Sequence, residues 1–444
     1  MDIIIVGAGI TGLAAAISLR RSGHRVALYE RSSMTNEVGA AINVPPNVAR
    51  FLLPWCKPPD IPDRGLDPKR ARFVETPGMY FMSHVTDEKL PAEFDHRSNV
   101  ELYGAPLYYA HRVDLHDALK GLATGDLGPG LKPEVHVRSK AVSYDPEEPS
   151  ITLADGTVVK ADLVIAADGV HSVAVEYVLG HRDPPEIPTG IKANLCYRFL
   201  IPKADVDNDP ETRVFNKTPL SMGCRVWVDI PGKKRLISYP CRDYEVINFI
   251  AILRDEKVDS TSEDWFASVD TSEILEQLSN FNPGLLKVVS KATEVKRWPL
   301  LYRAPISTWH KGRLVLAGDA AHPMLPHHAQ GGAQGIEDGL ALGLVFHGAT
   351  DPSQIAQRLA LYEKIRRGRA SAITIMSNFG FDEEAPEELI DFLEGHPIPK
   401  TVKEMIQLAY IPDVVKRTVQ TMTEFDPTWK LPEDFFCGGQ AEGF

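Results

Sequence analysis

The sequence predicts a mixed α/β fold in which a parallel sheet with helices is joined to a separate antiparallel layer and to a C-terminal helical region. The N-terminal segment has a short apolar strand, a glycine-rich turn, a helix and a second strand within about 30 residues, which is typical of a βαβ unit. Near residue 181 the pattern changes to longer alternating strands. The first pattern returns at residues 313–319, so we expect the parallel sheet to be assembled from discontinuous parts of the chain.

The elements of the N-terminal half follow from the periodicity of apolar residues. Residues 2–6 predict a strand, LAAAISLRRSG predicts a helix that ends at Gly23, and HRVALYE predicts the next strand. Residues 54–77 are rich in proline and charge and predict a surface excursion. A helix is expected to begin near residue 110, in AHRVDLHDALKGLA. The runs EVHVRSKAVSYD and SITLADGTVVKADLVIAAD predict several strands that return to the sheet.

The C-terminal half predicts an antiparallel layer, then helices. NLCYRFLIP, CRVWVDIP and KRLISYPCR read as alternating strands, with one amphipathic helix at SEILEQLSNF. After the strand RLVLAGD, two long helices are expected to extend to about residue 378. The tail, 379–444, is polar and proline-marked and predicts a helical cap.

Size and charge exclude several classes of function. A chain of 444 residues exceeds one simple core and predicts two or three domains. The net charge of −12 would repel phosphate-rich polymers on average, so nucleic acid is not an expected partner. Runs of 18 apolar residues do not occur, so no membrane span is expected. The apolar N-terminus lacks a basic region and predicts a structural element rather than a signal peptide.

The cysteines predict a reducing compartment. There are five, an odd number, and they are far apart without a C-x-x-C spacing, which is typical of scattered thiols in a cytoplasmic protein. The triplet NKT at Asn216 matches a glycosylation sequon, but such triplets are common and carry no weight without a secretory signal.

The glycine turn has the spacing of a dinucleotide-binding loop. Gly7 permits the tight turn, Gly9 lets a pyrophosphate approach the backbone, and Gly12 allows close helix–strand packing. Glu30 ends the next strand, where it can accept hydrogen bonds from adenosine ribose hydroxyls. This pattern does not by itself distinguish NAD from FAD.

Two further motifs follow apolar strands. In LVIAADGVHS, an apolar strand ends in Asp168-Gly169, which alone is an ordinary Asp-Gly turn. RLVLAGDAAHPMLPHHAQGGAQGIEDG combines an acid, histidines and glycines before a helix. A metal site at His322, His327 and His328 is the obvious alternative, but the spacing is not H-E-x-x-H and the prolines prevent a helix that would align two of them. We therefore expect no metal.

Together these segments resemble the single-component flavoprotein monooxygenases, the aromatic hydroxylase family that includes p-hydroxybenzoate and salicylate hydroxylases. The resemblance covers about residues 1–380 and is sharpest in GAGITG…YER, AHRVDLHDAL, ADLVIAADGVHS and GRLVLAGDAAHPMLP…GGAQGIEDG. Within the family, the sequence looks closest to the salicylate hydroxylase-like branch common in fungi.

The resemblance implies a Rossmann-like FAD-binding domain. Arg112 matches the arginine that reaches the flavin chain, and Asp319 matches the aspartate that binds a ribityl hydroxyl. EVGAAINVPPN resembles a G-A-G-I stretch beside the flavin, with Ala41 in place of the second glycine. The residues so assigned to cofactor binding are Gly7, Gly9, Gly12, Glu30, Arg31, Ala41, Arg112, Asp168, Asp319, Gly331 and Gly332.

The chain departs from the family at the Asp-Gly motif. In relatives this motif touches FAD and the nicotinamide donor, which implies a role for Asp168, but their D-G-x-H-S-x-x-R pattern has an arginine where this chain has Val175.

The family mechanism implies FAD, NADH or NADPH, and O2 as reactants. Reduced FAD adds oxygen to form a C4a-hydroperoxyflavin, whose terminal oxygen passes to an electron-rich substrate carbon. Negative charge at the N1/C2 carbonyl edge of the reduced flavin needs fixed positive dipoles, which a helix starting at Gly331-Gly332 would supply.

Substrate activation is expected from the antiparallel layer and the histidine loop. By their place in the fold, Arg198 and Tyr239 resemble an arginine and a tyrosine that relatives direct at a phenolic substrate. The alternative for each is a packing residue of its strand. His327 and His328 follow Pro326, where one of them could line the substrate pocket or relay a proton, whereas His322 is expected to be structural.

The resemblance also sets expected domain boundaries. The FAD-binding domain comprises residues 1–72, 107–180 and 300–378, the substrate-binding domain comprises 73–106 and 181–299, and the C-terminal helical cap comprises 379–444. We expect a monomer or a homodimer.

Other functions on the same fold stay open. A halogenase would show W-x-W-x-I-P, which Trp227 to Pro231 do not match, whereas an epoxidase or N-hydroxylase differs only in pocket shape. A non-catalytic binding protein of this fold need not retain both Arg112 and Asp319. The sequence leaves the substrate and the choice between NADH and NADPH undecided.

Overall fold

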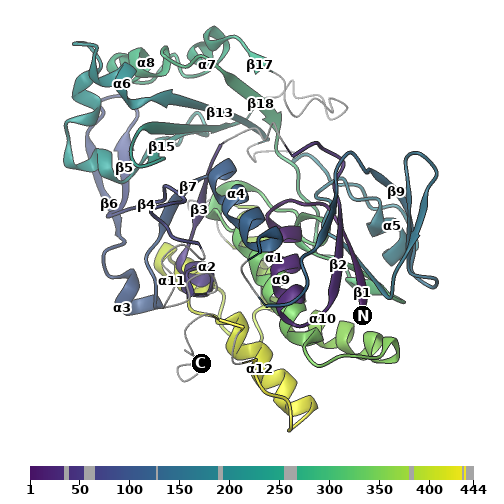
Figure 1. Ribbon diagram of the computed structural model, residues 1–444. Coiled ribbons are helices and arrows are strands. Elements are labelled where there is room, and N and C mark those ends of the chain that lie inside the picture. The colour runs from purple at the N-terminus through teal and green to yellow at the C-terminus, as the bar shows by residue number, and fades with distance from the viewer. Residues whose placement is uncertain are drawn as a thin grey trace.

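The computed structural model describes residues 1–34, 40–54, 66–126, 129–188, 194–254, 268–379, 385–432 and 435–436. It confirms the predicted fold class: a largely parallel sheet with helices, a large antiparallel sheet and C-terminal helices (Figure 1). In the described part of the chain, no helix has both the length and the apolar character needed to cross a membrane.

The parallel sheet has the strand order β19-β20-β12-β1-β2-β8. All neighbours are parallel except β19 and β20. β1 and β2 are joined by a helix, as a parallel βαβ connection requires. The strands are β1 (Asp2–Val6), β2 (Arg25–Tyr29), β8 (Glu134–His136), β12 (Leu163–Ala166), β19 (His310–Lys311) and β20 (Leu314–Leu316).

Helices α1 (Ile10–Arg21) and α9 (Gly331–Phe346) pack closely beside this sheet (Figure 1). A Cβ atom on Gly339 of α9 would lie 2.6 Å from the backbone carbon of Ala14 in α1, so the missing side chain permits the contact. The other helices here are α2 (Pro46–Leu52), α3 (Asn99–Tyr103), α4 (Arg112–Thr124), α5 (Ala174–Leu179) and α10 (Ile355–Ser377), with 3₁₀ turns η4 (Gly318–Ala320), η5 (Pro326–His328) and η6 (Pro352–Gln354).

The antiparallel sheet has the order β17-β18-β13-β16-β15-β14-β5-β6, and only β14 and β5 among its described neighbours run parallel. Its strands are β5 (Gly78–Ser83), β6 (Lys89–Asp95), β13 (Leu195–Pro202), β14 (Cys224–Asp229), β15 (Lys234–Cys241), β16 (Val246–Leu253), β17 (Ser268–Val269) and β18 (Val295–Pro299). Strands from residues 78–95 thus join those from 195–299.

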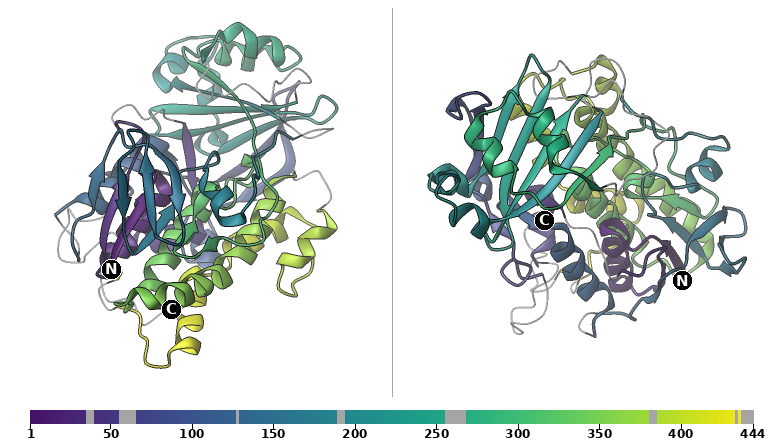
Figure 2. Two further views of the ribbon diagram at one scale, coloured as in Figure 1. Left: turned by 90° about the vertical axis from the view of Figure 1, so that its right-hand side faces the viewer. Right: turned by 90° about the horizontal axis from the view of Figure 1, so that it is seen from above.

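The two faces of the antiparallel sheet have different neighbours. The outer face carries Phe199, Leu236 and Phe249 and packs against α7 (Thr271–Gln277) and α8 (Pro283–Val289), which lie over the sheet in Figure 2. The inner face is defined here by Cys196, Arg198, Arg235, Ile237, Tyr239, Asn248, Ile250 and Trp298, which alternate with the outer residues and align across the strands. Its apolar members share a core with η5 and the end of α10.

One sequence expectation was wrong. The strands β9 (Ala141–Asp145), β10 (Ser150–Leu153) and β11 (Val158–Lys160) do not return to the parallel sheet but form a small antiparallel sheet of their own, and only β8 and β12 of that region join it. The short turn between β10 and β11 brings these strands back on each other, so they pair locally. The extra helix α8 and the short α6 (Lys203–Asp207) also exceed the single helix expected there.

The remaining elements complete the structure. Strands β3 (Ala41–Val44), β7 (Tyr108–His111) and β4 (Val74–Glu75) form an antiparallel sheet, so the expected surface excursion contains a strand; its residues 55–65 lie outside the described residues. The C-terminal region contains η7 (Glu387–Phe392), α11 (Val402–Tyr410) and α12 (Val414–Phe425), while η2 (Arg213–Asn216) and η3 (Pro219–Met222) lie beside α6 and β14. The proposed domain boundaries stay a prediction.

Candidate functional site

The glycine loop between β1 and α1 combines tight packing with open space. A Cβ atom on Gly7, whose φ is +96°, would lie 2.4 Å from the carbonyl oxygen of Ala167, and one on Gly12 would lie 1.9 Å from that of Gly7. A Cβ atom on Gly9 would meet nothing within 4 Å. Gly9 caps α1 without a side-chain hydrogen bond, so backbone N–H groups face this space, as a phosphate requires.

Glu30 is anchored to the same loop. Its carboxylate accepts hydrogen bonds from the backbone N–H groups of Ala8, at 2.8 Å, and Ser32, at 2.7 Å. A carboxylate can accept about four hydrogen bonds, so capacity remains for ribose hydroxyls. The neighbouring Arg31 is exposed and interacts electrostatically with Asp168, at the end of β12.

Asp168 has one unsatisfied oxygen. Its Oδ2 accepts a hydrogen bond of 2.7 Å from the Tyr144 hydroxyl, while the buried Oδ1 has no hydrogen-bond partner among the described residues. Desolvation raises the pKa of this carboxyl. A buried polar atom without a partner is expensive, and a ligand hydroxyl would satisfy it.

The position of the absent family arginine is apolar, and another arginine links the motif loops. Val175 is buried in the core around the parallel sheet. Arg303 is also buried, and its guanidinium donates to the carbonyl oxygens of Val170, at 3.4 Å, and Ala320, at 3.2 Å. It thereby connects the Asp-Gly loop with η4, a role that the sequence did not predict.

Asp319 and Arg112 lie close together. Asp319 is exposed in η4, and desolvation by the surrounding protein raises the pKa of its carboxyl, while His322 and Arg112 act in the opposite direction. Arg112 is the first residue of α4, and its backbone N–H donates to the carbonyl of Ala40 at 2.8 Å. The structure therefore brings Asp319 and Arg112 together from distant segments, as expected if both contact the ribityl chain of FAD.

Ala41 connects the cofactor side to the antiparallel sheet. Its backbone N–H donates to the Oδ1 atom of Asn248 at 3.1 Å, and both residues are buried. The Asn248 Nδ2 atom has no hydrogen-bond partner in the described part of the chain. Asn248 lies on the inner face of β16 and was missed by the sequence analysis, because its contact spans more than 200 positions.

The N-terminus of α9 is open to a ligand. Its cap residue, Gln330, makes no side-chain cap and instead bonds to Asn47 and Gln334. A Cβ atom on Gly332 would lie 2.8 Å from Ile42, and one on Gly331 would be in ordinary contact with Met324. The backbone N–H groups therefore stay available at this helix end.

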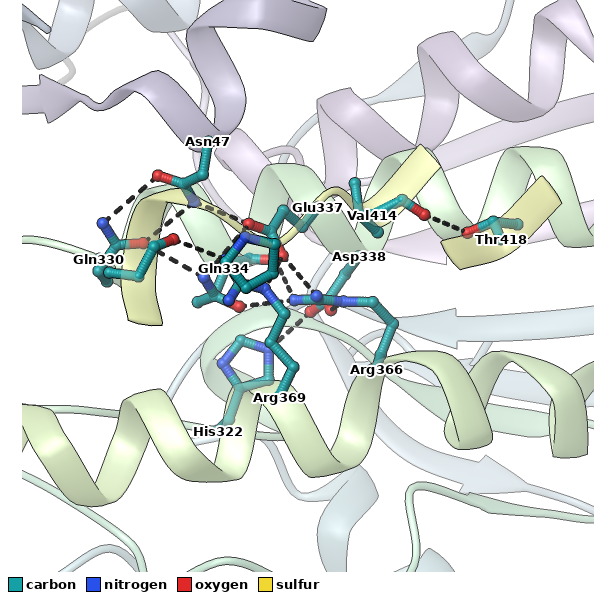
Figure 3. A network of polar contacts seen from close by, with 12 residues as sticks. Asn47, His322, Gln330, Gln334, Glu337, Asp338, Arg366, Arg369, Val414 and Thr418 are labelled. Carbon is teal, nitrogen blue, oxygen red and sulfur yellow. Dashed lines mark hydrogen bonds and ion pairs between the residues drawn. The ribbon is translucent and has the colours of Figure 1, made fainter. Parts of the chain in front are cut away.

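A buried polar network supports these loops from behind (Figure 3). Asp338 of α9 accepts from the Gly318 backbone N–H at 2.8 Å, from His322 at 2.6 Å and from Arg366 of α10 at 2.8 Å. Burial opposes ionisation, but His322 and Arg366 outweigh it and lower the pKa of Asp338. His322 is thus directed at Asp338, in agreement with a structural role.

The second carboxylate of the network is equally enclosed. Glu337 is bonded to Arg366, to Arg369 through both carboxylate oxygens and to Asn47 at 2.7 Å. Burial alone would raise the pKa of Glu337, but the two arginines lower it to about 2. The sequence signals were the acids of GIEDG in an apolar helix and the arginines of IRRGR, whose pairing required the tertiary fold.

Arg198 and Tyr239 share the inner face. Arg198 aligns with Ile250 of β16, which aligns with Ile237 of β15, two residues before Tyr239. The Arg198 guanidinium lies 4.8 Å from the ring centroid of Trp298, and its buried Nε atom has no hydrogen-bond partner within the described ranges.

Tyr239 is enclosed by aromatic and sulfur-containing residues. Its ring stacks on Tyr109 with centroids 4.3 Å apart. Burial raises the pKa of its hydroxyl well above the ordinary range, although Arg198 acts in the opposite direction. The hydroxyl is therefore protonated at neutral pH and can donate a hydrogen bond.

The two adjacent histidines of η5 are directed at different elements. The Nδ1 atom of His327 lies 3.3 Å from the Nη1 atom of Arg235 on the inner face. The His328 ring lies edge-on to Phe379, and burial, assisted by Arg235, lowers its pKa to about 4 while a bond to the Met376 backbone opposes this.

These features fit FAD at the predicted place. The open space beside Gly9, the unsatisfied Oδ1 of Asp168, the accessible Asp319 and the uncapped end of α9 offer groups for a phosphate, hydroxyls and an anionic ring edge. Arg198 and Tyr239 lie on the facing sheet, which the bonds of Ala41 and His327 join to the cofactor side.

Comparisons with known proteins support the same interpretation. A family model described as "FAD binding domain" matches residues 130–377, and one described as "FAD dependent oxidoreductase" matches residues 2–41. The FAD-dependent monooxygenase cfoG of Aspergillus candidus is 46% identical over 437 residues, which are 98% of each protein. 3-Hydroxybenzoate 6-hydroxylase 1 of Aquipseudomonas alcaligenes is 28% identical, with 86% of this chain and 89% of that protein covered. A salicylate hydroxylase substrate complex has a TM-score of 0.70 at 21% identity and covers 95% of this chain and 98% of the other.

Proposed function

Because the chain belongs to the FAD-dependent monooxygenases, we propose that it hydroxylates an aromatic substrate, phenolic or indolic, with NADH or NADPH as electron donor. The balanced reaction consumes the substrate, O2, one NAD(P)H and one proton and releases the hydroxylated product, water and NAD(P)+. One oxygen atom enters the substrate and the other leaves as water.

The observation that carries this proposal is the junction of two surfaces. The segment beside the cofactor site bonds to the inner face of the antiparallel sheet through Ala41 and Asn248, and η5 bonds to it through His327 and Arg235. A substrate on the inner face would therefore lie between the end of α9 and the pair Arg198 and Tyr239.

Bound FAD supplies the redox chemistry and the activation of oxygen. The residues that would hold it are the glycine loop and Glu30 for the adenosine half, Arg112 and Asp319 for the ribityl chain, and Gly331-Gly332 for the anionic edge of the ring. The backbone N–H groups of α9 provide fixed positive dipoles there. We extend the proposal to the donor: Asp168, which interacts electrostatically with Arg31, would contribute to binding NAD(P)H.

Arg198 and Tyr239 would have different roles in substrate activation. The Arg198 guanidinium would stabilise the negative charge of a phenolate, since it is permanently charged and already held against Trp298. Tyr239, whose hydroxyl stays protonated, would donate a hydrogen bond that orients the substrate oxygen. His327 would contribute from the opposite side, next to α9.

We propose that the enzyme works in the cytoplasm. Three cysteines of the described chain, Cys196, Cys224 and Cys241, are buried free thiols, which agrees with work in the reducing cytoplasm. We propose a monomer or homodimer acting on small molecules rather than on nucleic acid.

The test is oxidation of NADH and NADPH by the FAD-loaded protein in the presence of salicylate, 3-hydroxybenzoate, other phenols and indoles. We expect one substrate class to stimulate oxidation and to gain one oxygen atom by mass spectrometry. Epoxidation or N-hydroxylation gives the same mass but a different product by NMR, and halogenation requires halide in the product. Oxidation unaffected by every aromatic compound would refute the proposal.

A further inference from the structure

The histidine loop contacts a second arginine of the inner face, Arg235, which has no role in the substrate activation proposed above. Arg235 is half-buried on the inner face of β15 and aligns across the strands with Ile252, Cys196 and Trp298. Trp298 is the ring over which Arg198 lies. Arg235 therefore belongs to the same surface as the residues proposed to bind the substrate.

The contact between Arg235 and His327 determines how the imidazole is protonated. A guanidinium has N–H donors and no acceptor, and it stays charged throughout the pH range of proteins. At 3.3 Å from the Arg235 NH1 atom, the His327 Nδ1 atom must therefore be the acceptor. A neutral imidazole that accepts at Nδ1 carries its hydrogen at Nε2, so His327 is a hydrogen-bond donor at that atom.

His327 lies a few residues before the helix end that would face the flavin. His327 lies in η5, which is followed by Ala329 in the left-handed conformation (φ +52°), Gln330 and the first turn of α9. η5 therefore links Arg235 on the inner face, through His327, to the helix end that would face the flavin.

His328 is held differently, although it is adjacent in the sequence. Its ring packs on Phe379 and bonds to the backbone of Met376 at the end of α10. The buried ring thus fills the core behind η5, whereas His327 crosses to the sheet.

We propose that Arg235 is a positioning residue that fixes His327 as the Nε2–H tautomer, and that this Nε2–H donates a hydrogen bond to the oxygen of the aromatic substrate. This inference rests on the proposed hydroxylase function. It assigns His327 the role of donor and not of general base, because the nitrogen that could accept a proton is already engaged by Arg235.

Replacing His327 by glutamine or by asparagine distinguishes a hydrogen-bond donor at Nε2 from a general base. The Nε2 of glutamine occupies nearly the same place as the histidine Nε2, whereas the Nδ2 of asparagine mimics Nδ1. We expect His327→Gln to retain kcat/KM within about threefold, and His327→Asn to lose about 10- to 100-fold, the range of one hydrogen bond to a charged oxygen. Equal large losses of kcat in both variants would contradict the donor role and indicate a base.

Arg235 is tested by a matched pair of substitutions. Arg235→Met removes the donor and should lower kcat/KM to nearly the level of His327→Asn, whereas Arg235→Lys should recover part of it. The control is Lys234→Met, a neighbouring cation that faces the outer side of the same strand and bonds to the Gln277 carbonyl. We expect FAD content and turnover of this control to match the wild type; equal activity of Arg235→Met and the wild type would overturn the assignment.

A spectroscopic measurement keeps this inference separate from the proposed function. In the holoenzyme labelled with ¹⁵N-histidine, the His327 resonances, assigned by loss in His327→Gln, should show a protonated Nε2 and an unprotonated Nδ1. In Arg235→Met they should shift toward a mixture of tautomers. If the wild type oxidises no aromatic compound, the proposed function fails, whereas a protonated Nδ1 in the wild type refutes the tautomer assignment whatever the activity.

Discussion

In the parallel-sheet region, the functional residues lie within a few positions of a glycine turn or a strand end, whereas on the inner face of the antiparallel sheet they are spread over separate strands. Gly9, Asp168 and Asp319 each follow an apolar strand directly. Arg198 and Tyr239 meet only through the register of β13, β16 and β15. The cofactor side is therefore determined by local backbone shape, and the substrate side by strand pairing.

The two regions also differ in how charge is stabilised. Behind the cofactor loops, the carboxylates of Glu337 and Asp338 are paired with Arg366, and Arg369 and His322 each contact one of them. On the inner face, Arg198 has an aromatic neighbour, and its Nε atom has no hydrogen-bond partner among the residues that the structure describes. Charge stabilises a rigid arrangement in the first region and remains available for a ligand in the second.

The largest effect is expected from Arg366→Met. This arginine is fully buried between two fully buried carboxylates, and its removal leaves Glu337 with Arg369 and Asp338 with His322 as remaining partners, which costs about 3–5 kcal/mol of unfolding free energy. Chemical denaturation monitored by circular dichroism measures the loss. The control is Arg417→Met, whose ion pair with Glu394 is largely exposed and should contribute less than about 1 kcal/mol. Equal effects would show that the network is not a stabilising unit.

Acid should weaken the same network. Because the folded pKa of Glu337 is lowered to about 2, its stabilisation is complete above the ordinary carboxyl pKa of about 4.3 and is lost as the pH falls toward 2. Unfolding free energy should therefore decrease across that window by an amount on the order of 3 kcal/mol from this group. In Glu337→Gln the decrease should be smaller. An unchanged slope would mean that Glu337 is not the group responsible.

The glycine loop offers two matched substitutions. Gly12→Ala places a methyl group 1.9 Å from a backbone oxygen, and we expect a loss of about 1–3 kcal/mol in stability. Gly9→Ala meets no atom within 4 Å, so stability should stay within about 0.5 kcal/mol. FAD affinity, measured by fluorescence titration, should nevertheless fall by about tenfold or more in Gly9→Ala because the methyl group occupies the cofactor space. Unchanged affinity would place the pyrophosphate elsewhere.

A smaller and more selective effect is expected on the substrate side. Arg198→Ala should lower kcat/KM by about 10- to 100-fold through the loss of a charge-assisted hydrogen bond. FAD content and unfolding free energy should change little, because the guanidinium forms no ion pair among the described residues. Steady-state kinetics with the preferred phenol decide this, and full turnover in Arg198→Ala would remove the residue from the mechanism.

The sequence predicts the parallel-sheet region better than the inner face of the antiparallel sheet. β1, α1, β2 and the three motifs were predicted because their signals are local, and the comparisons confirm the family resemblance that the motifs carry. The small β9–β11 sheet was mistaken because alternation predicts a strand but not its partner.

The rest of the candidate site depends on long-range contacts. Asn248, Arg235 and Arg303 contact motif residues from distant strands or loops, and no periodicity marks them as functional. Arg198 and Tyr239 were selected by resemblance, and only the strand register places them on one face. Charged residues in an amphipathic strand look alike until the burial of each one is known.

If the inner face holds the substrate against the flavin, substrate binding should change the visible spectrum of bound FAD. Titration of the oxidised holoenzyme with the preferred phenol should perturb the flavin bands saturably in the wild type and in Lys234→Met. In Arg198→Ala the dissociation constant should rise by about 10- to 100-fold. A dissociation constant in Arg198→Ala identical to that of the wild type, or a flavin spectrum unaffected by any aromatic substrate, would show that the inner face does not hold the substrate against the flavin.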